Sequence, residues 1–166
     1  MNKFYQFAGF RQSVFFKKAF GLMICCLGIF VAVKAQVSVT STAGAPGTTV
    51  YGTLKAAFDG INAGTHQGDV TVSITGNTTE TVMAVLNASS APANYTTVLV
   101  KPSGAPRIIT GNLATPIVKL NGADNVTIDG TLGVGTTRDL SFTNSNTSTA
   151  SGVIWVASAS ASDGAN

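Results

Sequence analysis

The sequence has 166 residues, enough for one domain and too few for two domains of ordinary size. Apolar residues make up 45% of it, which excludes an intrinsically disordered chain, and only 10% of the residues are charged, compared with about a quarter in most globular proteins. The formal net charge of +3 at first suggests a weakly basic protein that binds nucleic acid. The 18 glycines and the many Thr, Ser and Asn residues favour a β-rich extracellular chain instead.

The first 35 residues differ in composition from the rest. Residues 1–18 contain four basic residues and no acid, and Ala19 to Val33 is a run of 15 uncharged residues. Val33 and Ala35 would then occupy positions −3 and −1 of a cleavage site. This order predicts a secretory signal peptide over residues 1–35. The apolar run is shorter than the ~20 residues of a permanent membrane helix, so we expect no membrane span after cleavage.

A lipoprotein signal is the weaker alternative for this segment. Cys25 and Cys26 are its two candidate lipidation sites, but Ile24 precedes the first, where Gly, Ala or Ser is usual.

Removing residues 1–35 changes the charge balance. Residues 36–166 keep five basic and seven acidic residues, a formal charge of −2, and neither cysteine. This part of the chain therefore forms no disulfide and offers no thiolate ligand. No basic cluster interleaved with aromatic residues remains, so nucleic-acid binding is excluded as a function class.

One helix is predicted after residues 36–50, which we expect to be a short strand or a linker. Between Thr53 and Gly64 the apolar residues are spaced for one helix face: Leu54, Phe58 and Ile61 follow Tyr51 at steps of three, four and three. Thr53 is suited to the N-cap and Gly64 to the first position after the helix. A single short amphipathic helix ahead of many strands is expected to cap the end of a sheet.

From Asp69 onward the apolar period changes to two, which predicts strands. Turn residues (Gly, Asn, Asp or Pro) separate the runs, which recur every 8 to 14 residues. The predicted strands are Val70–Thr75, Val98–Val100, Ile108–Ile109, Ile117–Leu120, Val126–Ile128, Leu140–Phe142 and Val153–Val156.

This spacing is typical of a sandwich, a barrel or a β-solenoid. A hairpin at Asn121-Gly122 would pair Ile117–Leu120 with a poor strand, because the next good strand begins only at Val126. In a right-handed parallel β-helix, Val126 would lie one coil after Val98, at the equivalent position of the next coil. Asn residues at the bends (Asn112, Asn121, Asn125 and Asn144) could stack and satisfy turn backbones. We therefore predict an all-β, right-handed parallel β-helix, with the cap helix and about three coils in residues 51–166.

The segment Asn121 to Gly130 (NGADNVTIDG) and the strand before it resemble a coil of a pectin-lyase-like parallel β-helix. The segment Thr53 to Phe58 resembles the N-terminal cap helix of that superfamily. Residues 36–166 are similar to the N-terminal part of large surface proteins that Gram-negative bacteria export by the type IX route. The resemblance implies further coils and a sorting domain beyond Asn166, so we expect a chain truncated at its C-terminus. It implies a fold and no specific activity, because the superfamily contains enzymes, scaffolds and adhesins.

The sequence predicts no catalytic, cofactor or metal site. His66 is the only histidine and is expected to face solvent in a loop, and one histidine without cysteine cannot bind zinc in the usual way. Asp124 and Asp129 are expected at successive bends, and Asp139 is expected to pair with Arg138. Neither arrangement supplies the paired acids of a hydrolase or the clustered acids of a calcium site. The acids are Asp59, Asp69, Glu80, Asp124, Asp129, Asp139 and Asp163.

Two further features have ordinary explanations. Five sequons, beginning at Asn77, Asn87, Asn94, Asn125 and Asn146, are expected by chance in a chain so rich in Asn, Ser and Thr. Trp155 is expected in the core or at the end of a stack and not as a sugar-binding platform.

The predicted function is that of a secreted or cell-surface segment with a structural or adhesive role and no catalysis. Its expected partners are extracellular polysaccharide or cell-surface components. Two alternatives stay open at this stage: the first part of a polysaccharide lyase or hydrolase, and a small β-sandwich binding module.

Overall fold

The computed structural model describes residues 34–159, which lie in the second of two compact units, Val33–Asn166. The predicted signal peptide, apart from its last two residues, and Asp163 lie outside the described residues. No helix within the described range is long and apolar enough to cross a membrane. The elements are β1 (Val37–Gly44), β2 (Thr49–Tyr51), α2 (Leu54–Asn62), β3 (His66–Ile74), β4 (Thr78–Glu80), β5 (Ala84–Asn87), β6 (Tyr95–Pro102), β7 (Arg107–Gly111), β8 (Pro116–Asn121), β9 (Val126–Ile128), β10 (Leu140–Asn144) and β11 (Gly152–Ala157).

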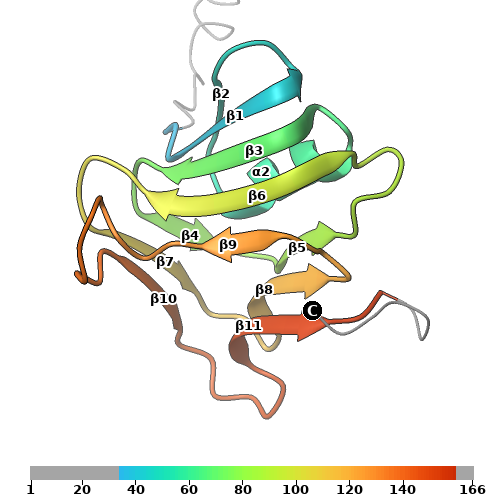
Figure 1. Cartoon of the computed structure of the whole chain (residues 1–166). Helices are drawn as coiled ribbons and strands as arrows, with labels where there is room; N and C mark the ends of the chain where they lie inside the picture. Colours follow the sequence, from blue (N-terminus) through green and yellow to red (C-terminus); the bar gives the residue numbers. More distant parts are fainter. Residues whose placement is uncertain (1–33, 160–166) are drawn as a thin grey trace, which may run out of the picture. The chain divides into compact units, whose positions relative to one another are not determined.

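These strands form three small sheets (Figure 1). The largest has the order β2-β1-β3-β6-β9, in which β1 is antiparallel to both its neighbours while β3, β6 and β9 are parallel. The other two, β10-β7-β4 and β11-β8-β5, are entirely parallel. From β3 onward each strand pairs with the third strand after it in the chain, so successive strands lie in different sheets.

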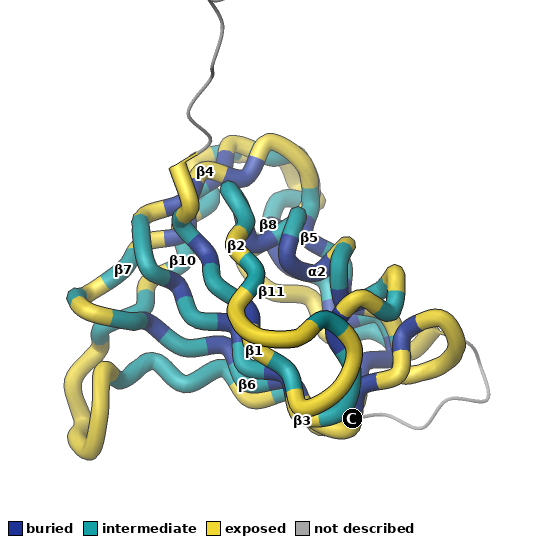
Figure 2. The backbone as a smooth tube through the Cα atoms, turned by 90° about the horizontal axis from the view of Figure 1, so that it is seen from above, coloured by how far each residue is buried: buried dark blue, intermediate teal, exposed yellow. Residues whose placement is uncertain are grey.

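The core fills the space between the sheets and is almost entirely aliphatic. Strand residues alternate between the core and the outside, as the colours of Figure 2 show along β3 and β6. In β3 and β6, for example, Val72 and Val100 are opposite each other and both are buried. Such in-register columns of Val, Ile and Leu bury apolar surface at about 25 cal/mol per Å², the main stabilising term of the fold.

Helix α2 covers one end of this core with the face that the sequence predicted. Leu54, Phe58 and Ile61 are buried, and the Thr53 hydroxyl accepts a hydrogen bond from the Ala56 amide at 3.1 Å, as an N-cap does. Gly64 follows the helix with φ +76°, where a Cβ would also come within 2.4 Å of the Pro92 carbonyl oxygen. The predicted helix, its N-cap and its terminating glycine are therefore confirmed.

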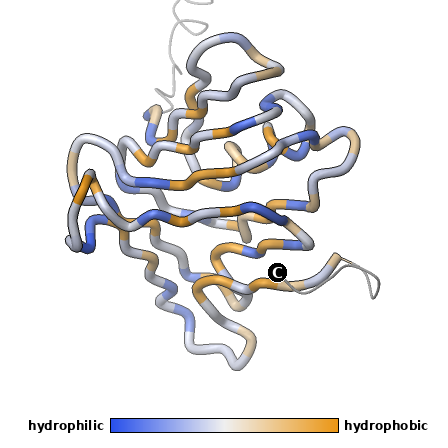
Figure 3. Tube along the Cα trace, viewed as in Figure 1, coloured by the Kyte–Doolittle hydropathy of each residue, from blue (hydrophilic) through white to orange (hydrophobic). Residues whose placement is uncertain are grey.

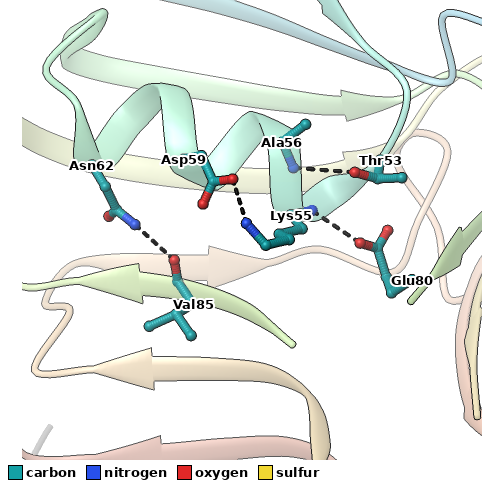
Figure 4. A network of polar contacts seen from close by, with 7 residues as sticks. All are labelled: Thr53, Lys55, Ala56, Asp59, Asn62, Glu80 and Val85. Atoms are coloured by element: carbon teal, nitrogen blue, oxygen red, sulfur yellow. Dashed lines mark hydrogen bonds and ion pairs between the residues drawn. The ribbon is translucent and has the colours of Figure 1, made fainter. Parts of the chain in front are cut away.

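A buried carboxylate fixes the N-terminus of α2 (Figure 4). Glu80, at the end of β4, is only 1% exposed. Its Oε1 accepts from the Leu54 amide at 2.9 Å and its Oε2 from the Lys55 amide at 3.1 Å. These amides belong to the first helical turn, which has no hydrogen-bond partners within the helix and carries the positive end of the helix dipole. The carboxylate thus accepts hydrogen bonds from two helix amides that have no acceptor within the helix. The same two hydrogen bonds satisfy both carboxylate oxygens in the protein interior.

The C-terminus of α2 is fixed to a strand edge by a side-chain amide. Asn62 Nδ2 donates to the Val85 carbonyl at 2.8 Å, as Figure 4 shows, and Asn62 Oδ1 accepts from the Asn87 amide at 3.0 Å. Asn62 therefore makes the pair of hydrogen bonds that a neighbouring strand would otherwise make with β5. This edge of the β11-β8-β5 sheet is closed by the helix and does not pair with another strand.

The predicted fold class, an all-β right-handed parallel β-helix, is wrong. The described residues form three separate small sheets and one helix, and the largest sheet is mixed because β1 runs antiparallel to β2 and β3. Residues 36–50, expected to be a short strand or a linker, contain β1 and the first two residues of β2. The error has a physical cause: a period of two shows that a strand has one dry face, but it does not encode the direction of the neighbouring strand.

Several finer predictions hold. Each of the seven predicted strands coincides with an observed one, and Val98 pairs with Val126 as expected from their phase. The antiparallel pairing of Ile117–Leu120 with Val126–Ile128, on which the sandwich alternative depends, is absent from the described chain: β8 pairs with β5 and β11, and β9 with β6.

Asn side chains bridge equivalent bends, also as expected. Asn121 donates to Asn87 Oδ1 at 3.2 Å, and Asn146 donates to Asn112 Oδ1 at 2.9 Å. Asn144 hydrogen-bonds with both backbone groups of Leu113. The Asn144 amide thus satisfies turn backbone groups, while the other two contacts join side chains of neighbouring bends.

Replacing Glu80 with Ala should lower the free energy of unfolding by about 3 kcal/mol, because two helix amides lose a charged acceptor inside the protein. Glu80→Gln should lower it less, since one amide oxygen can replace only one of the two acceptors. Urea denaturation followed by circular dichroism measures both. Asp59→Ala is the control: it removes the exposed ion pair of Asp59 with Lys55 and should cost less than about 0.5 kcal/mol. Equal losses in Glu80→Ala and Asp59→Ala would contradict the structural role of Glu80.

Candidate functional site

The acidic residues do not form a common site in the described part of the chain. Among residues 34–159 no group of three or more His, Cys, Asp or Glu side chains is placed to hold a metal ion. Glu80 caps α2, Asp59 pairs with Lys55, and Asp69 accepts from the Thr97 hydroxyl at 2.9 Å. Each of these carboxylates therefore has a local structural partner.

Asp129 and Asp139 both hold the loop between β9 and β10. Asp129 Oδ1 accepts from the amide and the hydroxyl of Thr131, and these bonds lower the pKa of Asp129, with a smaller contribution from the charge of Lys101. Asp139 Oδ2 accepts from the Leu132 amide at 3.0 Å and from the Thr137 hydroxyl. The expected pairing of Asp139 with Arg138 is not found in this part of the chain, where Lys55–Asp59 is the one ion pair.

Asp124 lies in the bend between β8 and β9 and influences a buried phenol. Tyr95 is 4% exposed, and its hydroxyl donates to the Asn87 carbonyl at 2.5 Å. Burial, with a smaller contribution from the charge of Asp124, raises the pKa of Tyr95 to about 12. Tyr95 is thus a neutral hydrogen-bond donor that anchors the segment between β5 and β6.

His66 is buried, and the prediction of a solvent-facing loop residue is wrong. It is the first residue of β3 and is 0% exposed. Its Nε2 lies 2.8 Å from the Tyr51 hydroxyl, and its Nδ1 lies 3.3 Å from the Ser41 hydroxyl. The Tyr51 ring stands edge-on to the imidazole at 5.8 Å between centroids. A loop position was expected because the segment Gly64 to Gly68 has the composition of a turn after the helix. In the structure the ring nitrogens of His66 instead have partners on β1 and β2.

The Ser41–His66–Tyr51 cluster ties three strands together. Both ring nitrogens of His66 have partners, and no surface of the ring is open to a substrate. Space for the phenol depends on Gly60, where a Cβ would come within 2.4 Å of the Tyr51 hydroxyl oxygen. This close approach explains a glycine in a helix interior, which costs about 1 kcal/mol relative to Ala. The arrangement is typical of a structural polar cluster.

The side chain best placed to meet a ligand is Trp155. Of the two locations expected for it, the core is wrong, whereas β11 does lie at the end of its sheet in the described chain. In β11 its neighbours Ile154 and Val156 are in register with the buried Val118 and Leu120. Since successive residues of a strand point to opposite faces, Trp155 points to the outer face of the β11-β8-β5 sheet. It is 51% exposed there.

Trp155 lines a hollow of about 320 Å³ on this face. The hollow is formed where three segments approach one another: the residue before β5, the start of β8 and the end of the loop before β11. Its walls are almost wholly apolar. The lining residues are Met83, Thr115, Pro116, Ala150 and Trp155.

Lys119 supplies the charge next to this hollow. It is in register with Trp155, and its ammonium lies 5.0 Å from the centre of the indole ring, within the range of a cation–π contact. Lys119 forms no ion pair with any described residue. We call the hollow together with Lys119 the Trp155 site. It combines an exposed aromatic face, an apolar wall and one uncompensated positive charge.

The side chains of three of the five sequon asparagines, Asn77, Asn87 and Asn146, make hydrogen bonds. Asn77 Oδ1 accepts from the Ile108 amide at 3.0 Å, and Asn87 Oδ1 accepts from Asn121. Asn125 takes φ +55°, a left-handed conformation that Asn tolerates at a bend. These structural roles account for Asn77, Asn87, Asn125 and Asn146 without glycosylation.

No family model matches the chain, and no curated protein and no solved structure matches it. The resemblance to pectin-lyase-like proteins and to proteins exported by the type IX route therefore stays a prediction from the sequence.

The stability of the fold should decrease as the pH falls below about 7, because of His66. Burial lowers the pKa of His66 below its ordinary value of 6.5, so the unfolded chain takes up a proton at a pH where the folded chain does not. The contribution of His66 is complete above pH 6.5 and is lost as the pH falls from 6.5 through the lowered folded-state pKa. Thermal unfolding midpoints between about pH 8 and pH 5 measure the effect. The slope should be absent in His66→Gln, and a slope unchanged in that variant would contradict the assignment.

Proposed function

We propose that this chain is a secreted or cell-surface binding segment with a structural or adhesive role, and that it binds extracellular polysaccharide at the Trp155 site. The observation that carries the proposal is the half-exposed indole on the outer face of the β11-β8-β5 sheet, beside an apolar hollow. A large aromatic side chain in this position costs solubility, which a binding role explains.

The chemistry of the site suits a sugar ring. The C–H face of a pyranose is apolar and packs on an indole, while its hydroxyls require polar neighbours. Thr115 lies in the wall of the hollow, and Lys119 adds a cation beside the ring. Because the cation has no carboxylate partner among residues 34–159, a polysaccharide that carries carboxylates is favoured over a neutral one.

Binding without catalysis is the simpler hypothesis. Five of the six carboxylates in the described chain are held by another group, such as α2, Lys55 or the turn at Thr131, so they do not form the pair that a glycoside hydrolase uses. The enzyme alternative would need acids directed at a substrate beside Trp155, and none lines the hollow.

The test is binding of the protein to polysaccharides of both charge classes. Affinity electrophoresis in gels with polygalacturonate, alginate, dextran or hydroxyethyl cellulose compares the wild type with Trp155→Ala. We expect binding to an acidic polysaccharide and at least a roughly tenfold loss of affinity in Trp155→Ala, since a central aromatic anchor contributes more than about 1.4 kcal/mol. Lys119→Met should weaken binding to the acidic polymers only, and added salt should have the same effect.

Val134→Ala is the control variant, because Val134 is a fully exposed apolar residue of the loop between β9 and β10. It should bind as the wild type does. The proposal fails if none of the four polymers retards the wild-type protein, or if Trp155→Ala binds as well as the wild type.

A further inference from the structure

The hollow of the Trp155 site contains the one sulfur atom of residues 36–166. This atom is the thioether of Met83, which lines the hollow together with Trp155. With no thiol in residues 36–166, the thioether is the group that a mild oxidant such as hydrogen peroxide attacks. The other four sulfur-containing residues lie in the predicted signal peptide and are Met1, Met23, Cys25 and Cys26.

Met83 is placed where an oxidant in solution reaches it. It lies in the short segment between β4 and β5 and is only partly buried. Val82, the residue before it, is 55% exposed. The hollow itself is open to solvent beside the half-exposed indole of Trp155. Hydrogen peroxide is little larger than water, so it can enter the hollow and meet the sulfur.

The walls around Met83 suit a thioether and do not suit its oxidised form. Pro116, Ala150 and Trp155 offer carbon surface, and Thr115 brings the one side-chain hydroxyl of the lining. The strand that carries Trp155, β11, is one of the strongly hydrophobic stretches in Figure 3. A thioether is a weak acceptor that packs well against an aromatic ring, whereas the oxygen of a sulfoxide is strongly polar and costly to hold without a donor. Oxidation therefore replaces part of the apolar wall with a group that retains water.

We infer that Met83 is an oxidation site and that its oxidation switches off the Trp155 site. The sulfur lone pair attacks one oxygen of hydrogen peroxide, and the S–O bond forms as the O–O bond breaks. The leaving hydroxide takes up the proton of the transferred hydroxyl, so the products are the sulfoxide and water. Sulfur has lost two electrons and the peroxide has gained them. Methionine sulfoxide reductases reverse the step with two electrons from a dithiol, which becomes a disulfide as water is released.

Mass spectrometry and tryptophan fluorescence of the full-length protein test the inference without a ligand. After treatment with dilute hydrogen peroxide, the tryptic peptide of residues 56–107, whose only methionine is Met83, should gain one oxygen, and the peptide with Trp155 should gain none. Trp155 is the only tryptophan, so the emission reports on this indole alone. We expect the emission to move to longer wavelength, because the surroundings of the indole become more polar. The reductases for both sulfoxide epimers, with dithiothreitol, should restore it, and the circular dichroism spectrum should stay that of the folded protein throughout.

Two variants separate oxidation in the hollow from oxidation elsewhere. In Met83→Leu, peroxide should leave the emission unchanged. Val134→Met in the Met83→Leu background is the matched control, because it places a methionine at a fully exposed loop residue. Its oxidation should be visible in the mass and absent from the emission.

The effect on binding rests on the proposed function and is measured separately. Each protein is compared with its own untreated sample by affinity electrophoresis in polygalacturonate. Oxidation should weaken the binding of the wild type by about tenfold or more and should not change the affinity of either variant.

The inference is overturned if peroxide oxidises Trp155 instead of Met83, or if oxidation of Met83 leaves the emission unchanged or unfolds the protein. An equal shift in the Val134→Met control, or equal binding by the oxidised and untreated wild type, would also overturn it. If the untreated wild type binds no polysaccharide, the proposed function fails by itself. The mass and the emission then still decide whether oxidation of Met83 alters the site.

Discussion

The bond between the Glu80 carboxylate and the first turn of α2 is the interaction on which the rest of the structure depends. It places the helix over one end of the core, where Leu54, Phe58 and Ile61 meet the first strands of the sheets. A buried carboxylate is costly unless its oxygens are satisfied, and helix amides are costly when left without acceptors. Each group removes the free-energy cost of burying the other without a hydrogen-bond partner. The helix is therefore held in one position on the core.

Once the helix is in place, the two ends of the sheets have different properties. Asn62 closes the β5 edge, while no described strand covers the outer edge of β11, where Val153 to Val156 are partly exposed. The same strand carries Trp155 on its outer face beside Lys119.

Much of the local structure follows from the sequence, but the pairing of the strands and the candidate site do not. The α2 face, the Thr53 cap and the strand at Val98 are recognisable because periodicity and capping are local properties. The antiparallel β1 is not, because the alternation of Val and Thr is the same for either strand direction. Glu80 and His66 gained their roles from residues 15 to 26 positions away: Leu54 and Lys55 for Glu80, and Tyr51 and Ser41 for His66. The outward direction of Trp155 depended on the register of β11 with β8, which no spacing in the sequence specifies.

Native-state amide hydrogen exchange, resolved residue by residue in dilute solution, tests the central claim most directly. If Glu80 and Asn62 hold α2 on the core, the amides of Leu54, Lys55 and Asn87 should be protected to nearly the same degree as those in the middle of β3 and β6. The amides of the loop between β9 and β10 should exchange far faster. Exchange of the Leu54 and Lys55 amides at the rate of that loop would show that the helix is not held by Glu80, and would contradict the account.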